Sequence, residues 1–183
     1  MNRNTAMKLF GLLGLLMLLS CGYADRHRNS SSCEQALVDS LEVRVQDSLF
    51  SNVHYSRSQL LEALTQTQDS LVYYRLLALY GKTFFVSSDF DSILYYNRRV
   101  KEFSRNASQS SESLQSPRWN DVLSDVYNIE GNVWMQLNRP DSAIIDYKKA
   151  YGYRLEGKKL HLLPDICINI ADAYLHRSDL AHT

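Results

Sequence analysis

The side chains best suited to chemistry are few and scattered along this sequence. Five histidines occur, at His27, His54, His161, His176 and His182. The last two stand six residues apart, whereas two metal ligands on one helix need a spacing of three or four. The sequence contains no glycine-rich phosphate loop, no Gly-x-Ser-x-Gly, no His-Glu-x-x-His and no Cys-x-x-Cys. We therefore expect solvated histidines and a protein that is not an enzyme, with no catalytic, cofactor or metal site.

Two pairs of basic residues and two pairs of tyrosines form a second group. Arg98-Arg99 and Lys148-Lys149 are expected on the exposed sides of helices, where they would bind acidic peptides only if they faced a groove. Tyr73-Tyr74 and Tyr95-Tyr96 are expected to pack between helices. The 20 Lys and Arg residues balance the 20 Asp and Glu residues, so nothing in the net charge indicates nucleic acid.

The first cysteine follows an export signal. "MNRNTAMK" carries two basic residues, and "LFGLLGLLMLLS" follows as an apolar run. This run is shorter than the ~20 residues of a spanning helix. Leu18-Leu19-Ser20-Cys21 resembles the bacterial lipoprotein box, with a slight departure at Leu19. The resemblance implies that Cys21 is acylated and anchors the chain to a membrane facing the periplasm. The alternative is cleavage after Gly22-Tyr23-Ala24, which would release a soluble periplasmic protein.

The two other cysteines, Cys33 and Cys167, would lie in an oxidising compartment. They either form a disulfide or remain free. We favour an unpaired Cys167 buried in a helix core. Residues 1–21 are therefore interpreted as the signal peptide with its lipobox, 22–33 as a flexible tether and 34–72 as a helical lead-in.

The remainder, residues 73–183, contains an internal repeat. "LYGKTFFVSSDFDSILYYNRRV" (79–100) aligns without gaps with "IEGNVWMQLNRPDSAIIDYKKA" (129–150). Gly81 matches Gly131, and Phe84 matches Trp134. Each segment is expected to be a helix, a short break and a second helix, because small residues let helices cross closely while aromatic residues fill the space between hairpins.

The repeat resembles the tetratricopeptide repeat (TPR), a helix-turn-helix unit of 34 residues. The signature positions of the better copy are Tyr127, Glu130-Gly131, Trp134, Ala143, Tyr147 and Ala150. Those of the earlier copy are Leu77, Tyr80-Gly81, Phe84, Ile93, Asn97 and Val100. Glu130, Ile93 and Asn97 depart from the family pattern, and the last two predict a more loosely packed first hairpin. The resemblance implies an all-α fold of antiparallel hairpins stacked as a right-handed α-solenoid.

A third, partial copy matches at Cys167, Ile170-Ala171 and Tyr174, with a polar break expected at Arg177-Ser178-Asp179. The units are about 73–106, 124–157 and 164–183, and the last is incomplete. We therefore expect the chain to be the N-terminal part of a longer protein. The offsets between units are 50 and 40. The excess falls on "RNASQSSESLQSPRWND" and "LEGKKLHLLPD", as loops or as extra turns of the second helices. We interpret "NASQSSESLQSP" as an exposed loop.

Asp-Ser followed by an apolar residue occurs five times, with serines at Ser40, Ser48, Ser70, Ser92 and Ser142. The simpler interpretation is helix entry, because both side chains accept hydrogen bonds from free N–H groups of a first helical turn. Asp91-Ser92 and Asp141-Ser142 fit it best, since they open second helices. The alternative rests on resemblance to exported proteins of the Bacteroidota, in which this pattern marks O-glycosylation.

Stacked hairpins of this kind imply a scaffold that holds a protein or peptide in a concave groove, without chemistry. By resemblance to Bacteroidota proteins, the segment would be the sensor portion of a membrane-tethered signalling protein. The alternative is a glycan-binding outer-membrane lipoprotein of the starch-utilisation type, although the long insertions of that class are absent. No cofactor is expected.

Overall fold

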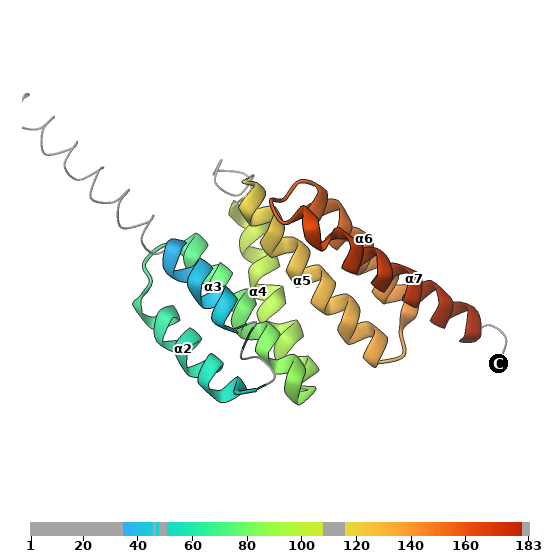
Figure 1. Ribbon diagram of the computed structural model, residues 1–183, viewed down its shortest axis with the longest axis horizontal. Coiled ribbons are helices and arrows are strands. Elements are labelled where there is room, and N and C mark those ends of the chain that lie inside the picture. Colours follow the sequence, from blue (N-terminus) through green and yellow to red (C-terminus); the bar gives the residue numbers. More distant parts are fainter. Residues whose placement is uncertain (1–34, 46, 48–50, 108–115, 181–183) are drawn as a thin grey trace, which may run out of the picture. The chain divides into compact units, whose positions relative to one another are not determined.

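The computed structural model describes residues 35–45, 47, 51–107 and 116–180 (Figure 1). The described part consists of helices and short connections, and it contains no strand, so the fold is all-α as expected. The chain divides into two compact units, Met1–Ser40 and Leu41–Thr183. Of the first unit, residues 35–40 are described and are helical. No helix within the described ranges is long and apolar enough to cross a membrane.

The second unit continues with helix through residue 45 and then contains six α-helices whose bounds are defined. These are α2 (Val53–Gln66), α3 (Ser70–Lys82), α4 (Phe90–Ala107), α5 (Pro117–Gln136), α6 (Pro140–Leu155) and α7 (Leu163–Leu180). The 3-10 helix η1 (Thr83–Ser87) lies between α3 and α4, and η3 (Leu160–Leu162) precedes α7. The described residues of the predicted lead-in are helical apart from residues 51–52 and 67–69.

Local signals in the sequence start these helices. The side chain of Asn52 accepts from the Tyr55 N–H before α2, and that of Asp69 accepts from the first turn of α3. Ser116 accepts from the Trp119 N–H before α5. Pro117 and Pro140 occupy the first positions of α5 and α6, where a missing N–H has no cost.

The turns inside the two hairpins are equivalent at the offset of 50. Ser88 and Asn138 both have a positive φ, 53° and 57°. In the first turn Asp89 N–H donates to Phe84 O at 3.2 Å, and in the second Arg139 N–H donates to Trp134 O at 2.8 Å. Each left-handed residue also donates its N–H three residues back. Both helices therefore end in the same left-handed cap, which supports the predicted repeat at the level of the backbone.

Among the described residues, apolar clusters join the helices α3 to α7. The first joins α3 and α4 to α5 through Leu77, Val100, Trp119, Leu123 and Val126. The second joins α4 to α5 through Ile93, Ile129 and Val133. The third joins α6 to α7 through Ala143, Ile144, Tyr147 and Ala173. Each cluster takes residues from more than one helix, so each joins neighbouring helices.

Two expectations about the C-terminal part are wrong. The polar break at Arg177-Ser178-Asp179 is absent, because α7 continues to Leu180. The turn before α6 has Asn138 in the left-handed region and Pro140 at the first position of the next helix, and neither an asparagine nor a proline follows Leu175, although the turn before α4 forms with Ser88 and without a proline. Cys167 is exposed rather than buried, since α7 packs inward through Ile166 and Ala173 instead.

The excess length between the second and third copies is a loop. The segment between α6 and α7 is a turn followed by η3, and α6 ends at Leu155. The corresponding segment between α4 and α5, residues 108–115, lies outside the described residues.

Candidate functional site

The predicted small residues lie where the helices of a hairpin cross. A Cβ atom added at Gly131 would lie 2.3 Å from Cε1 of Tyr147 on α6. One added at Gly81 would lie 2.9 Å from Cβ of Tyr96 on α4. The two helices of each hairpin therefore approach each other more closely than a side chain at residue 81 or 131 would allow.

The helices of the first hairpin contact each other less extensively than those of the second, as the departures at Ile93 and Asn97 predict. Both side chains are fully buried, as is Val100. Asn97 takes the position that Tyr147 holds in the second hairpin, and its Nδ2 donates to Val126 O on α5 at 3.2 Å. The neighbouring residue Tyr96 provides the aromatic ring instead, and this ring lies against Tyr80 and Phe84. The sequence interpretation missed this one-residue exchange.

The other signature residues also lie in the interfaces. The Trp134 Nε1 donates to Asp146 on α6 at 2.8 Å, and the Tyr147 hydroxyl donates to Asn132 at 2.7 Å. Ala143 and Ala150 are fully buried. Tyr74 stacks on Phe103, whereas Tyr95 is 52% exposed, so only part of the tyrosine pairs packs between helices.

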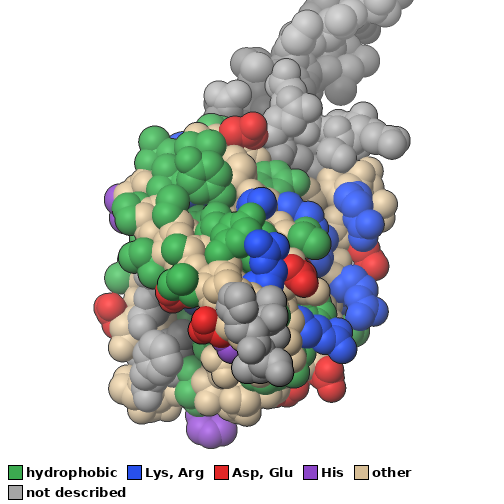
Figure 2. Space-filling model, turned by 90° about the vertical axis from the view of Figure 1, so that its right-hand side faces the viewer, with side chains coloured by type: hydrophobic (Ala, Val, Ile, Leu, Met, Phe, Trp, Pro, Cys, Tyr) green, Lys and Arg blue, Asp and Glu red, His purple; other side chains and the backbone are tan. Residues whose placement is uncertain are grey.

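Only some signature residues of the third copy pack against the preceding helices. Tyr174 packs against the cluster around Tyr147, with Lys148 Nζ 5.4 Å from its ring centre. Ala171 is exposed, and so are Ile168 and Leu175 beside it on α7. Figure 2 faces the end of the molecule that carries α7 and shows hydrophobic side chains gathered on one side, with Lys and Arg on the other.

Between the two hairpins lies a cavity of about 240 Å³. Four cations line it: Arg98, Lys101 and Arg105 from α4, and Lys149 from α6. Tyr127 and Leu123 of α5, Tyr153 of α6 and Ser104 of α4 complete the lining, and no acidic residue belongs to it. One predicted basic residue from each pair, Arg98 and Lys149, is thus brought to one site; Arg99 and Lys148 are not in the lining.

Tyr127 is the centre of this site. Its ring stacks on Tyr153, with centres 5.7 Å apart and planes 6° from parallel. The ammonium groups of Lys101 and Lys149 lie 5.2 and 5.0 Å from the centre of the same ring. Burial raises the pKa of the Tyr127 hydroxyl to about 12, with Tyr153 and Glu130 adding to the shift. The ring therefore stays neutral and holds two ammonium groups by cation–π attraction.

Two carboxylates outside the lining pair with these lysines. Glu130 of α5 contacts Lys101 Nζ at 2.6 Å and is almost fully buried. Asp146 of α6 contacts Lys149 Nζ at 3.0 Å. Burial raises the pKa of Glu130, while Lys101 opposes that shift. The departure from the TPR pattern at Glu130 therefore has a structural use, because this carboxylate positions a cavity lysine.

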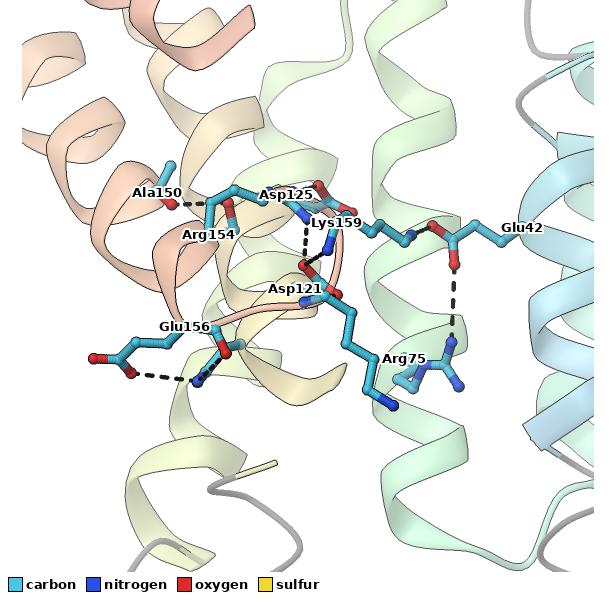
Figure 3. A network of polar contacts seen from close by, with 11 residues as sticks. Glu42, Arg75, Asp121, Asp125, Ala150, Arg154, Glu156 and Lys159 are labelled. Carbon is cyan, nitrogen blue, oxygen red and sulfur yellow. Dashed lines mark hydrogen bonds and ion pairs between the residues drawn. The ribbon is translucent and has the colours of Figure 1, made fainter. Parts of the chain in front are cut away.

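A buried ion-pair network fastens the second hairpin and was not found in the sequence (Figure 3). Arg154 of α6, 1% exposed, contacts Asp121 at 2.6 Å and also binds Asp125. Asp121 accepts the backbone N–H groups of Lys158 and Lys159 as well. Glu42 binds Lys159 and lies 3.8 Å from Arg75. Asp121 thereby anchors the loop between α6 and α7 onto α5.

The loop can approach Asp121 only because residue 157 is glycine. A Cβ atom there would lie 2.3 Å from Asp121 Oδ1. No sequence signal indicates that Asp121 and Arg154, 33 positions apart, are in contact. The sequence does show an acidic residue early in α5 and a glycine in a basic loop.

The Asp-Ser pairs differ in role. Asp69 caps α3 as helix entry predicts, with Ser70 exposed behind it. Before α4 the acceptor is Asp89, which binds the N–H and the hydroxyl of Ser92, so Asp91 is not the cap. Asp141 lies within the first turn of α6, where Arg139 provides no side-chain cap. Ser40 is exposed and Ser142 half-buried.

Other predicted residues fall elsewhere. Cys21, Cys33, Ser48, His27 and His182 lie outside the described residues. His54 and His161 are exposed, and His176 Nε2 lies 2.8 Å from Asn138 Oδ1. Within the described ranges, no three His, Cys, Asp or Glu residues form a group able to hold a metal ion.

Comparisons with known proteins find no similarity to report. No protein-family model matches the chain, and no curated protein and no solved structure matches it significantly.

Proposed function

We propose that this chain is a non-catalytic, TPR-like module that binds a polypeptide partner and is held at a membrane through acylated Cys21. The all-α fold is observed, and its assignment as a TPR-type solenoid is part of the proposal. Its support is the pair of hairpins that share turn geometry and a glycine crossing at one offset.

The observation that carries the binding role is the cavity between the hairpins. Its lining comes from α4 of one hairpin and from α5 and α6 of the next. A single hairpin would not make this surface, because the cations of α4 and Lys149 of α6 meet only when the hairpins pack together. Repeat proteins bind through surfaces that stacking creates in this way.

The test is selection of ligands from a random displayed peptide library by the full chain purified in detergent. We expect enrichment of peptides that bind saturably and are recovered chemically unchanged. Absence of any saturable binder would contradict the binding role, and recovery of cleaved or modified peptides would contradict the non-catalytic assignment.

A further inference from the structure

We propose that the outer face of α7 binds an amphipathic helix of a partner polypeptide, which lies antiparallel to α7 and places an arginine against Asp165. The outer face is formed by Pro164, Ile168, Ala171 and Leu175. No residue of α7 belongs to the lining of the cavity between α4, α5 and α6. The inference therefore concerns a second surface and does not depend on the cavity.

The outer face is an apolar stripe exposed along one helix. Its residues follow at spacings of four, three and four, which places them on one side of α7. Ile168 is 58% and Leu175 64% exposed, whereas Ile166 and Ala173 on the other side of the helix are buried. Figure 2 shows hydrophobic side chains gathered at the end of the molecule that carries α7. A stripe with this spacing is typical of a surface that packs against another helix.

The internal repeat extends to α7 in three dimensions as well as in sequence. At the offset of 40, Ala173 corresponds to Val133 of α5. Val133 packs α5 against Ile93 of α4, and Ala173 packs α7 against Ala143 of α6. The side of α7 that is turned to α6 is therefore the side that α5 turns to α4. It follows that the remaining sides of α5 and α7 can be compared residue by residue.

The outer face of α7 is the counterpart of the surface that α5 presents to α6. Pro164, Ala171 and Leu175 correspond at the offset of 40 to Ser124, Gly131 and Met135. All three residues of α5 contact α6: the Ser124 hydroxyl donates to a backbone carbonyl of α6 at 2.8 Å, and the other two pack at Tyr147. The element that fits the outer face is therefore a helix packed antiparallel to α7, as α6 packs on α5.

Charge indicates a basic residue on the partner helix. Asp165, Asp172 and Asp179 follow at spacings of seven along one edge of the outer face, and all three are exposed. Among the described residues, none of these carboxylates takes part in an ion pair. Asp165 corresponds to Asp125 of α5, which binds Arg154 of α6. Two antiparallel copies of α7 would turn the same aspartates toward each other, so a second copy fits this face less well than a helix with an arginine.

The experiment uses a labelled peptide with the sequence of α6, residues 140–155, as the probe. This sequence carries the residues that match α5, namely Ala143, Tyr147, Ala150 and Arg154. Fluorescence anisotropy measures its binding to the full chain in phospholipid nanodiscs, with empty nanodiscs as the blank. We expect saturable binding that Leu175→Ala weakens about tenfold, because less apolar surface is buried. Leu61→Ala is the matched control, since Leu61 is an exposed leucine of α2, and it should bind like the parent protein.

Ala171→Leu tests whether a helix crosses the face at residue 171. The larger side chain adds apolar surface but keeps an incoming helix at a distance, so binding of the peptide should weaken. Non-specific adhesion to an apolar surface would instead strengthen, and that result would overturn the inference. Ala171 is exposed, so the variant should unfold at the same temperature as the parent protein.

A charge exchange tests the arginine. Asp165→Lys should weaken binding of the peptide by up to about fivefold, as for one exposed ion pair. A second peptide, with Arg154→Glu, should bind Asp165→Lys better than it binds the parent protein. If Asp165→Lys bound both peptides as the parent protein does, the partner arginine would not lie at Asp165 and the inference would be wrong.

Two further results would also overturn the inference. One is the absence of saturable binding of the α6 peptide. The other is a dimer of the full chain, seen by analytical ultracentrifugation and dissociated by Leu175→Ala, which would assign the face to a second copy. Neither result bears on the proposed function, because the peptide selection described above tests that function without reference to α7.

Discussion

Gly131 of α5 lies directly against the ring of Tyr147 on α6, so closely that a methyl group at residue 131 would lie 2.3 Å from Cε1 of the tyrosine. Tyr147 is also fixed by its hydroxyl bond to Asn132 and by its place in the cluster with Ala173. The ring therefore cannot move away without disturbing the contact to α7.

Gly131→Ala should consequently destabilise the protein by about 2 kcal/mol, because overpacking forces the helices apart. Gly152→Ala is the control, since nothing lies within 4 Å of its Cβ position on the same hairpin. That change should stabilise the protein by about 0.5–1 kcal/mol through helix propensity. Urea denaturation of both variants measures the difference, and equal stabilities would show that the helices do not cross at residue 131.

The buried Arg154 pair makes a second prediction. Arg154→Ala should reduce the free energy of unfolding by about 3–5 kcal/mol, because Asp121 would remain buried without its cation. Arg177→Ala removes an arginine whose contact with Asp141 at 3.5 Å is largely exposed, and it should cost less than about 1 kcal/mol. Urea denaturation followed by circular dichroism compares the two. A small effect at Arg154 would mean that Asp121 is hydrated in solution.

The pair of Lys101 and Glu130 predicts a dependence on pH. Lys101→Met leaves Glu130 buried without its cation, so its pKa in the folded protein should rise further above the ordinary 4.5. A raised folded-state pKa favours folding below the unfolded value, and this contribution is lost as pH rises through the folded-state pKa. The stability deficit of the variant should therefore be small below pH 4.5 and grow to about 1–3 kcal/mol near neutrality.

The double variant Lys101→Met/Glu130→Gln is the control for this effect, because glutamine does not titrate. Its unfolding free energy, measured by urea denaturation at several pH values, should show no such widening relative to the parent. A deficit in Lys101→Met that is the same at every pH would mean that Glu130 is not the group responsible.

The proposed anchor at Cys21 predicts a change of partition. Cys21→Ser should lose labelling by radioactive palmitate in an exporting bacterial host and should move from the detergent phase to the aqueous phase. Two or more acyl chains are needed for stable anchoring, so loss of the acylated residue should release the protein. Persistent partition of Cys21→Ser into detergent would contradict the lipoprotein proposal.

The hairpins could be predicted because their signals are local. Glycine at the crossing, an aromatic residue three positions later and a polar break recur at one offset, and the left-handed turns at Ser88 and Asn138 fall where that offset places them. The same reasoning failed at Arg177-Ser178-Asp179, where α7 continues to Leu180 and polar residues alone do not end a helix.

The polar contacts could not be predicted in the same way. Asp121 and Arg154 meet because two helices pack at a particular rotation, which periodicity does not specify to within one residue. In the first hairpin the aromatic contact was expected at residue 97 but is made by Tyr96, which is also an error of one residue. Cys167 was placed on the wrong face of α7 for this reason too. The spacing of Arg98, Lys101 and Arg105 was an available signal, but only the packing of α6 supplies Lys149 and makes it a site.

The most direct measurement of the central claim is nuclear magnetic resonance of the tyrosine rings of the full chain during titration with a peptide enriched in the library selection. The signals of Tyr127 and Tyr153 should shift together and saturate, because both rings line the cavity. The signal of Tyr55, exposed on α2 outside the lining, should stay in place. Unmoved Tyr127 and Tyr153 signals in the presence of bound peptide would contradict the account.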